Sequence, residues 1–222
     1  MPPDTRPLSD EIDPEPRWQA LVAALATGGL YLALPRGLTV GPRWLFPTIV
    51  GFLLIVTVVL HRARRHDLDR VFGFTLTAFI TAQMIVSLGL LVSALPDRRE
   101  TPIALLVSAT SLWCTNVVVF ALWYWRLDAG GPHGREAQPG HAEGAFLFPQ
   151  MALPPESRAA LDLDDWSPNF VDYLFLAFNT STAFSPTDTP ALTRWAKVLM
   201  MLQSIISLTV LVLLAARAVN IL

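Results

Sequence analysis

Long runs of apolar residues alternate with short polar segments along this chain. A helix needs about 20 mostly apolar residues to cross a bilayer, with a range of about 17 to 25. Five runs meet this length, at residues 18–34, 44–60, 71–95, 102–123 and 198–216. The third and fourth runs are joined only by residues 96–101, so they must form an antiparallel hairpin. The pattern predicts an all-α integral membrane protein with five transmembrane helices.

A sixth apolar segment, residues 169–178, is too short to cross. Ser167 can cap the free N–H groups of a helix, and Pro168 suits the first helical position. A helix of about 10 residues rises only about 15 Å, half of a roughly 30 Å hydrocarbon core. We therefore expect one short re-entrant helix between the fourth and fifth transmembrane helices. The alternative is a helix lying flat at the interface, followed by an ordinary loop.

A polar run, residues 179–188, follows the short helix, and Thr189-Pro190 then repeats the cap-and-proline signal before the last helix. Non-helical backbone at membrane depth is tolerated only where it is buried in protein or lines a wet cavity. A half-helix, a polar turn and a full helix are typical of a pore loop or a substrate-binding hairpin. The candidate pore or filter residues are Thr180, Thr182, Ala183, Phe184, Ser185, Pro186, Thr187 and Asp188.

Two polar residues of the last helix, Gln203 and Ser207, lie one turn apart. In a pore-loop protein this face would line the central path. In a monomer the same groups would only cross-link the helix bundle. Asp188 also has two interpretations, as part of a ring of charge in a pore or as a cap at the start of the last helix.

These residues resemble the pore region of the potassium-channel superfamily. Aligned without gaps from Phe178, residues 183–188 fall where that family has its Thr-Val-Gly-Tyr-Gly-Asp filter, and Lys197 matches a basic residue early in the inner helix. Ser185 and Thr187 replace the two glycines, and Pro186 replaces the Tyr. Ser and Thr resist the positive φ that those glycines adopt. The resemblance implies a homo-oligomer, a tetramer if channel-like, that discriminates weakly between monovalent cations.

Over nearly its whole length, the chain is also similar to a family of uncharacterised bacterial inner-membrane proteins, known as a domain of unknown function. The matching segments are the His/Arg-rich residues 61–66, the aromatic-rich residues 123–126, residues 178–188 and residues 218–220. This resemblance implies a multi-pass protein of the bacterial cytoplasmic membrane. It constrains fold and location more than chemistry.

Composition supports the membrane assignment. Hydrophobic residues make up 53% of the chain and charged residues 15%, which exceeds the apolar content of soluble domains of this size. A net charge of −2 and the lack of a basic patch give no reason to expect a nucleic-acid partner. The single Cys114 excludes a disulfide within the chain. No catalytic or cofactor motif occurs, so we expect neither an enzyme nor a cofactor or metal.

Two further segments complete the expected domain organisation. Residues 1–17 are Pro-rich and acidic, so we expect a disordered tail before the four-helix bundle at 18–125. Residues 126–166 mix Gly, Pro and acids, which predicts a flexible linker before the re-entrant helix, turn and last helix at 167–222. His133 and His141 lie in this linker with too few neighbours to predict a metal site. Within the linker, residues 145–149 are apolar enough to dock on the membrane surface or the bundle.

Basic residues near the membrane indicate the orientation of such a protein. The tail, residues 61–70 and the linker with its short helix lie on one side by parity and carry eleven Arg and Lys residues, against five on the other side. The count places the N-terminus in the cytoplasm. A pore loop would then enter from the cytoplasmic side, inverted relative to potassium channels.

Three functions are consistent with this sequence. The first is an oligomeric pore for cations, in which Asp188 and the hydroxyls of residues 180–187 supply oxygen ligands. The second is a small-solute transporter or membrane enzyme, for which Asp172 and Asp188 are the candidate ionisable groups. The third is a membrane scaffold whose tail and linker bind a partner. We favour the first, and catalysis has the weakest support.

Overall fold

The computed structural model describes residues 15–94, 101–137, 144–164, 166–182 and 188–219. Over these residues the chain is helical apart from loops and one isolated β-bridge. The longer helices are α1 (Trp18–Leu32), α2 (Leu45–Arg62), α3 (His66–Ala94), α4 (Pro102–Leu127), α7 (Phe170–Thr182) and α8 (Arg194–Val219). The shorter ones are η1 (Arg36–Leu38), η2 (Asp128–Gly130), α5 (Pro132–Ala137), η3 (Pro149–Ala152) and α6 (Pro155–Ala160). The all-α prediction is therefore confirmed for the described residues.

Four helices in the described residues, α2, α3, α4 and α8, are long and apolar enough to cross a membrane. The remaining expected span, residues 18–34, forms a helix of 15 residues that ends at Leu32. A helix of that length falls short of the about 17 residues that a bilayer requires. Pro35 disfavours helical backbone at the residue before it, which explains the early end. Helix α1 packs against α2 and α4, and the count of five spans stays a prediction.

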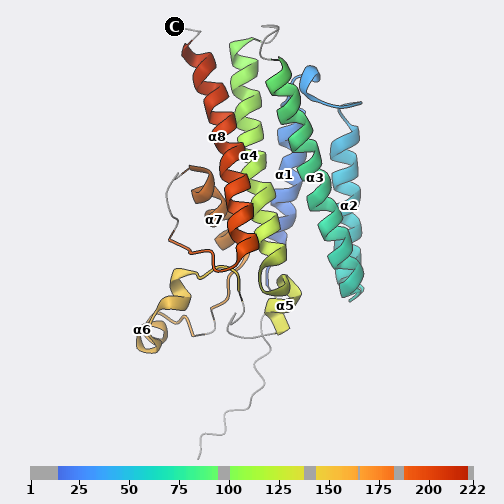
Figure 1. Ribbon diagram of the computed structural model, residues 1–222. Coiled ribbons are helices and arrows are strands. Elements are labelled where there is room, and N and C mark those ends of the chain that lie inside the picture. Colours follow the sequence, from blue (N-terminus) through green and yellow to red (C-terminus); the bar gives the residue numbers. More distant parts are fainter. Residues whose placement is uncertain (1–14, 95–100, 138–143, 165, 183–187, 220–222) are drawn as a thin grey trace, which may run out of the picture.

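The long helices stand side by side in one bundle (Figure 1). We call one end of this bundle the tail end, because it carries Arg17, the turn at residues 63–65 and α5. The chain enters α1 at the tail end, and α3 and α4 form the expected antiparallel hairpin at the opposite end. Over the described residues, the segments that parity assigns to one side of the membrane therefore lie at one end of the molecule.

Helix α4 is central, since it packs against α1, α3, α7 and α8. Its stripe of small hydroxyl residues is buried, as expected for helix contacts. Ser108 donates to the Ala104 carbonyl at 2.6 Å, and Thr115 donates to the Ser111 carbonyl at 2.8 Å. These hydroxyls bond within their own helix and let neighbouring backbones approach. The structure thus favours packing over a hydrophilic path for this stripe.

The segment expected to be a flexible linker folds against the bundle over its described residues. Phe146 is 0% exposed and Phe148 3% exposed, and both rings contact Tyr173 of α7 edge-on. A β-bridge pairs Phe146 with Ala191, just before α8. The docking predicted for residues 145–149 is confirmed, and its site is the bundle. These buried aromatic contacts and the β-bridge hold a segment whose Gly and Pro content suggested a mobile chain.

Helix α7 has 13 residues, which corresponds to a rise of about 20 Å. It starts near the tail end, runs beside α4 and α8, and stops partway along them (Figure 1). The described chain resumes at residues 188–193, which lie at the tail end and lead into α8. We call α7 together with residues 188–193 and the start of α8 the α7 hairpin. The expectation of a re-entrant helix is based on this arrangement.

Candidate functional site

The base of α7 is capped differently from the sequence prediction. Asn169 takes the capping position, since its side-chain oxygen accepts a hydrogen bond from the Val171 N–H at 2.8 Å. Asp172 reaches back and accepts from the Asn169 N–H at 2.8 Å. Burial raises the pKa of the Asp172 carboxyl above its ordinary value. Ser167 is exposed and precedes the helix, so the predicted Ser167 cap is wrong.

A buried network fixes this base to the rest of the molecule. The Tyr173 hydroxyl donates to Asp128 Oδ2 at 2.6 Å, and the other Asp128 oxygen accepts from the Ala145 N–H at 2.5 Å. Burial raises the pKa of the Tyr173 phenol well above its ordinary value, so the hydroxyl stays a donor. Arg135 of α5 lies over the Tyr173 ring, 5.0 Å from its centroid, and binds Glu15 at 2.8 Å. The base of α7 is thus held by α5 and by the residues before α1.

The upper part of α7 is fixed to α8 by Gln203, which is fully buried. Its Nε2 donates to the Ala177 carbonyl at 2.6 Å and to Ser181 Oγ at 2.8 Å. Its Oε1 accepts from the Tyr124 hydroxyl of α4 at 2.6 Å. A single amide therefore joins three helices.

Ser207 belongs to the same contact. The Asn116 amide of α4 donates to Ser207 Oγ at 2.9 Å and to the Gln203 carbonyl at 3.3 Å. Gln203 and Ser207 therefore face α4 and α7 within one chain, as in the cross-linking alternative. Lining of a central path by this face has no geometric support in the single chain.

The candidate filter residues occupy different environments. Thr180 is buried and donates to the Leu176 carbonyl at 2.8 Å, whereas Thr182 is exposed and donates to the Phe178 carbonyl at 3.0 Å. Ala183, Phe184, Ser185, Pro186 and Thr187 lie outside the described residues. Asp188 is exposed, at the tail end.

The last helix also begins later than its sequence signal predicts. It starts at Arg194, where Thr193 Oγ1 accepts from the Ala196 N–H at 3.4 Å. Asp188 therefore does not cap α8, and this interpretation is wrong. Residues 190–192 stay extended because they pair with residues 145–147, through Leu192 N–H to the Ala145 carbonyl at 2.7 Å.

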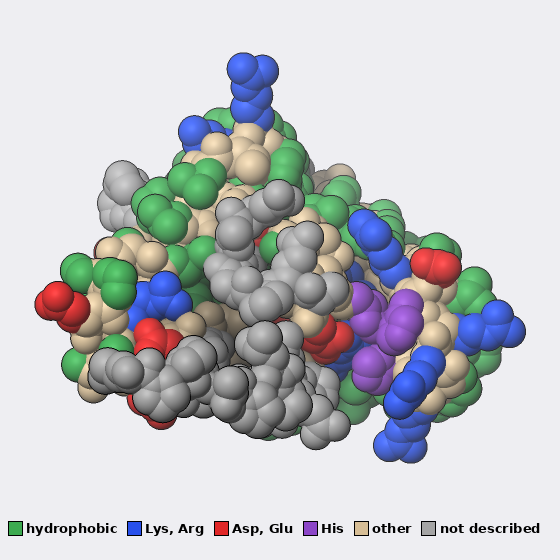
Figure 2. Space-filling model, turned by 90° about the horizontal axis from the view of Figure 1, so that it is seen from below, with side chains coloured by type: hydrophobic (Ala, Val, Ile, Leu, Met, Phe, Trp, Pro, Cys, Tyr) green, Lys and Arg blue, Asp and Glu red, His purple; other side chains and the backbone are tan. Residues whose placement is uncertain are grey.

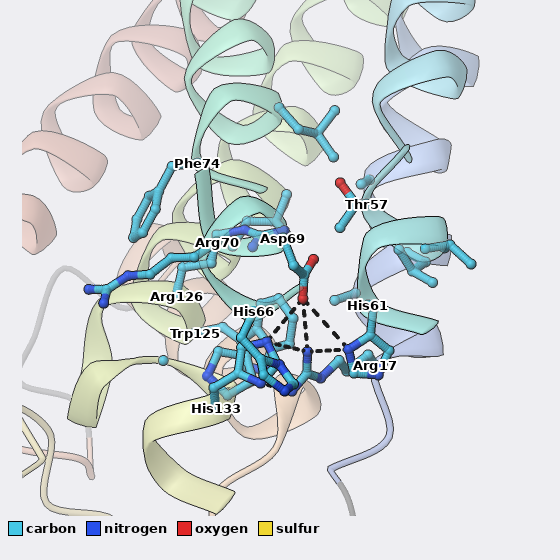
Figure 3. A pocket seen from close by; sticks show the side chains of 18 of the residues that line it. Arg17, Thr57, His61, His66, Asp69, Arg70, Phe74, Trp125, Arg126 and His133 are labelled. Carbon is cyan, nitrogen blue, oxygen red and sulfur yellow. Dashed lines mark hydrogen bonds and ion pairs between the residues drawn. The ribbon is translucent and has the colours of Figure 1, made fainter. Parts of the chain in front are cut away.

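A second site lies at the tail end and was not predicted. A cavity of about 540 Å³ opens there among α1, α2, α3, α4 and the loop leading into α5 (Figure 3). Apolar side chains line most of it, including Leu21, Ala24, Leu54, Leu76 and Leu122. Viewed from this end, the histidine side chains form one patch bordered by basic and acidic groups (Figure 2). The cavity is therefore apolar inside and ionisable at its mouth.

Three potential metal ligands meet at this mouth: His61 of α2, Asp69 of α3 and His133 of α5. His133 Nε2 lies 3.0 Å from Asp69 Oδ2, and His61 Nδ1 lies 3.6 Å from the same oxygen. One ligand atom from each residue lies within 4.8 Å of the other two. Asp69 is only 5% exposed. A carboxylate buried to this degree needs cationic or donor partners.

Arg17 supplies the cation in this cluster. Its NH1 lies 3.2 Å from Asp69 Oδ2, 2.9 Å from His61 Nδ1 and 3.0 Å from His133 Nε2. Its NH2 donates to both Glu136 oxygens, at 3.0 and 2.9 Å. The dashed lines of Figure 3 converge on this guanidinium group.

A second arginine, Arg126, lines the same cavity. Its Nε donates to Thr77 Oγ1 at 3.2 Å, and its guanidinium lies 5.1 Å from the Trp125 ring centroid. The guanidinium also lies against Gly73, where an added Cβ would meet its NH1 at only 1.9 Å. Any larger residue at position 73 would therefore push Arg126 out of its position.

The cluster was missed because its members are far apart in the sequence. His61 and Asp69 stand in residues 61–70, between two expected spans, and His133 stands in an expected linker. The structure instead continues α2 to Arg62, begins α3 at His66 and forms α5 around His133. The sequence did contain one signal for this cluster. Parity places His61, Asp69 and His133 on the same side of the membrane, close to the expected helix ends.

No protein-family model, curated protein or solved structure matches this chain. The resemblances to potassium channels and to a bacterial inner-membrane family therefore stay predictions.

Proposed function

We propose that the protein is a homo-oligomeric, pore-loop type membrane protein that conducts monovalent cations with weak selectivity. One observation carries the proposal: a 13-residue helix, α7, is packed against both α4 and α8 and is tethered at its base and along its upper part. The chain enters and leaves this hairpin at the same end of the bundle. The order helix, half-helix, turn and helix is that of a pore module.

The fixed position of α7 gives the proposal an electrostatic basis. A helix carries about half a negative charge at its C-terminal end, which favours cations within the last turn. The Gln203 bonds to Ala177 and Ser181 hold that end in place against α8. Thr182 is exposed at this end, so its hydroxyl is available to a permeating ion.

A conduction path from one such hairpin requires several subunits around an axis. The outer faces of α7 and α8 are apolar, with Phe175 60% exposed, Phe178 46% exposed and Ile205 60% exposed. Such faces contact either lipid tails or another subunit in a membrane. We propose that this outer face of α7 and α8 contacts neighbouring subunits, as a tetramer if channel-like.

We further propose that the protein lies in a bacterial cytoplasmic membrane with its tail end in the cytoplasm. Arg62, Arg64, Arg65 and Arg70 gather at this end, and cytoplasmic segments are enriched in such residues. The hairpin of α7 then enters from the cytoplasmic side.

Single-channel recording of the purified full chain in planar bilayers tests this function. We expect discrete openings in the wild type, with a reversal potential that follows the cation gradient. Asp188→Asn removes a charge at the proposed entrance and should lower conductance and cation preference, and Thr182→Ala should change conductance. Asp164→Asn removes an exposed carboxylate before α7 and serves as the matched control, with unchanged currents.

Two outcomes would contradict the proposal. One is the absence of current across voltage and cation gradients from protein shown to be folded and oligomeric. The other is a set of openings that neither Asp188→Asn nor Thr182→Ala alters. Either result would favour small-solute transport or a scaffold role instead.

A further inference from the structure

We propose that His61, Asp69 and His133 form a binding site for a divalent transition-metal ion of the zinc type, and that Arg17 competes with the metal for this site. The inference concerns the tail-end cavity rather than the α7 hairpin. It does not depend on ion conduction.

The ligand set is the first argument. Two imidazoles and one carboxylate are the ligands of many three-residue zinc sites, in which a fourth position takes water or another ligand. The three residues come from α2, α3 and α5, so the fold, rather than sequence proximity, brings them together. Asp69 is buried, whereas the His61 and His133 side chains are 42% and 26% exposed, which leaves an entry path for an ion.

The distances are the second argument. Two ligands that each lie about 2.1 Å from a tetrahedral zinc ion are about 3.4 Å apart. The observed separations from Asp69 Oδ2 are 3.0 Å to His133 Nε2 and 3.6 Å to His61 Nδ1. The two pairs thus lie within about 0.4 Å of tetrahedral spacing. The two histidine nitrogens lie within 4.8 Å of each other, and rotation of the imidazoles would adjust this third pair.

Arg17 is the third argument. Its NH1 lies between 2.9 and 3.2 Å from all three candidate ligand atoms, so a cationic group already occupies their centre. A metal ion and this guanidinium cannot share the space, because they overlap and repel each other. Glu136 binds the other guanidinium nitrogen at 2.9 Å and gives the displaced Arg17 a second anionic partner.

The surroundings set the expected strength of binding. His66 packs edge-on against His133, with ring centroids 4.4 Å apart, and Asp67 and Arg70 also border the cavity. Arg126 lines the same cavity and adds repulsion. With one buried carboxylate against two nearby arginines, we expect the wild type to bind metal weakly, and removal of Arg17 to strengthen binding.

The test is titration of the purified full chain in detergent with Co²⁺, whose visible absorption reports the ligand set, followed by competition with Zn²⁺. We expect one ion per chain. Arg17→Gln should bind at least about tenfold more tightly, because a charge-assisted competitor is gone. Asp69→Asn and His133→Ala should each lose at least about 100-fold, since even outer-shell partners of a metal are worth about 10- to 100-fold.

Asp164→Asn provides a matched control, because Asp164 is an exposed carboxylate in the segment before α7 and does not line the cavity. Its affinity should stay within about twofold of the wild type. The loss in Asp69→Asn does not depend on how well the Arg17 variant folds.

The proposal fails if Asp69→Asn and His133→Ala keep the wild-type Co²⁺ spectrum and affinity. It also fails if folded Arg17→Gln binds no more tightly than the wild type. In that case the cluster is an ion-pair network that holds α1, α2, α3 and α5 together.

Discussion

Gln203 lies buried where α4, α7 and α8 meet, and both ends of its amide are used. The nitrogen serves two acceptors of α7 and the oxygen accepts from Tyr124 of α4. A polar group without a partner in an apolar interior costs more than a normal hydrogen bond contributes. The Gln203 amide therefore contributes to stability in two ways. It forms hydrogen bonds, and it prevents buried polar groups of α4 and α7 from being left without a partner.

We predict that Gln203→Leu lowers the free energy of unfolding by about 1–3 kcal/mol, because Tyr124 and the Ala177 carbonyl lose their partner. Gln19→Leu is the matched control, since the Gln19 side-chain oxygen is buried without a hydrogen-bond partner. That substitution should be neutral or stabilising. Thermal unfolding in detergent measures both. Equal effects of the two changes would show that the amide network does not hold α7.

At the scale of elements, α5 connects the start of the chain to the base of α7. Arg135 is 4% exposed and donates to the Trp125 and Asp128 carbonyls at 2.9 and 3.1 Å. It also pairs with Glu15, which accepts a further short hydrogen bond from the Trp125 indole. Arg135 of α5 bonds the Asp128 carbonyl, and the Asp128 carboxylate bonds Tyr173 of α7. The position of α5 therefore helps to fix the position of α7.

We predict that Arg135→Met lowers the free energy of unfolding by about 3–5 kcal/mol. The Glu15 carboxylate is only 10% exposed, and the substitution removes its guanidinium partner. Amide hydrogen exchange should rise in α5 and in the first turn of α7. The control is Arg158→Met in α6, where a half-buried arginine donates to the Asp164 carbonyl at 2.9 Å. Unchanged exchange at the base of α7 in a folded Arg135→Met protein would contradict this role.

The sequence predicted elements better than it predicted their contacts. Hydrophobic length identified α2, α3, α4 and α8, because a membrane span is a property of one continuous segment. The short apolar length of α7 was also apparent. The docking of residues 145–149 was predicted, but the partners of Phe146 and the position of His133 were not, because partners such as Tyr173 and Asp69 lie more than 25 residues away. For the same reason, the pairing of residues 190–192 with residues 145–147, after which α8 begins at Arg194, was not predicted.

At the scale of the whole molecule, charge is distributed unevenly between the two ends. The tail end carries the arginine-rich turn between α2 and α3, the histidine cluster, and the entry and exit of the α7 hairpin. Orientation in the membrane therefore determines which compartment can reach both the proposed pore and the proposed metal site. Basic residues predict that this compartment is the cytoplasm.

Cysteine labelling would determine this orientation. Cys114 is half-buried inside α4, so Cys114→Ser gives a background without thiols. On it, Asp164→Cys at the tail end should react with a membrane-impermeant maleimide only from the cytoplasmic face, and Pro42→Cys at the opposite end only from outside. Both positions are exposed, so each serves as the control for the other. The reverse pattern would mean that the basic-residue count misassigns this protein. The α7 hairpin would then enter from outside, in the orientation of potassium channels, and the histidine cluster would face extracellular metal.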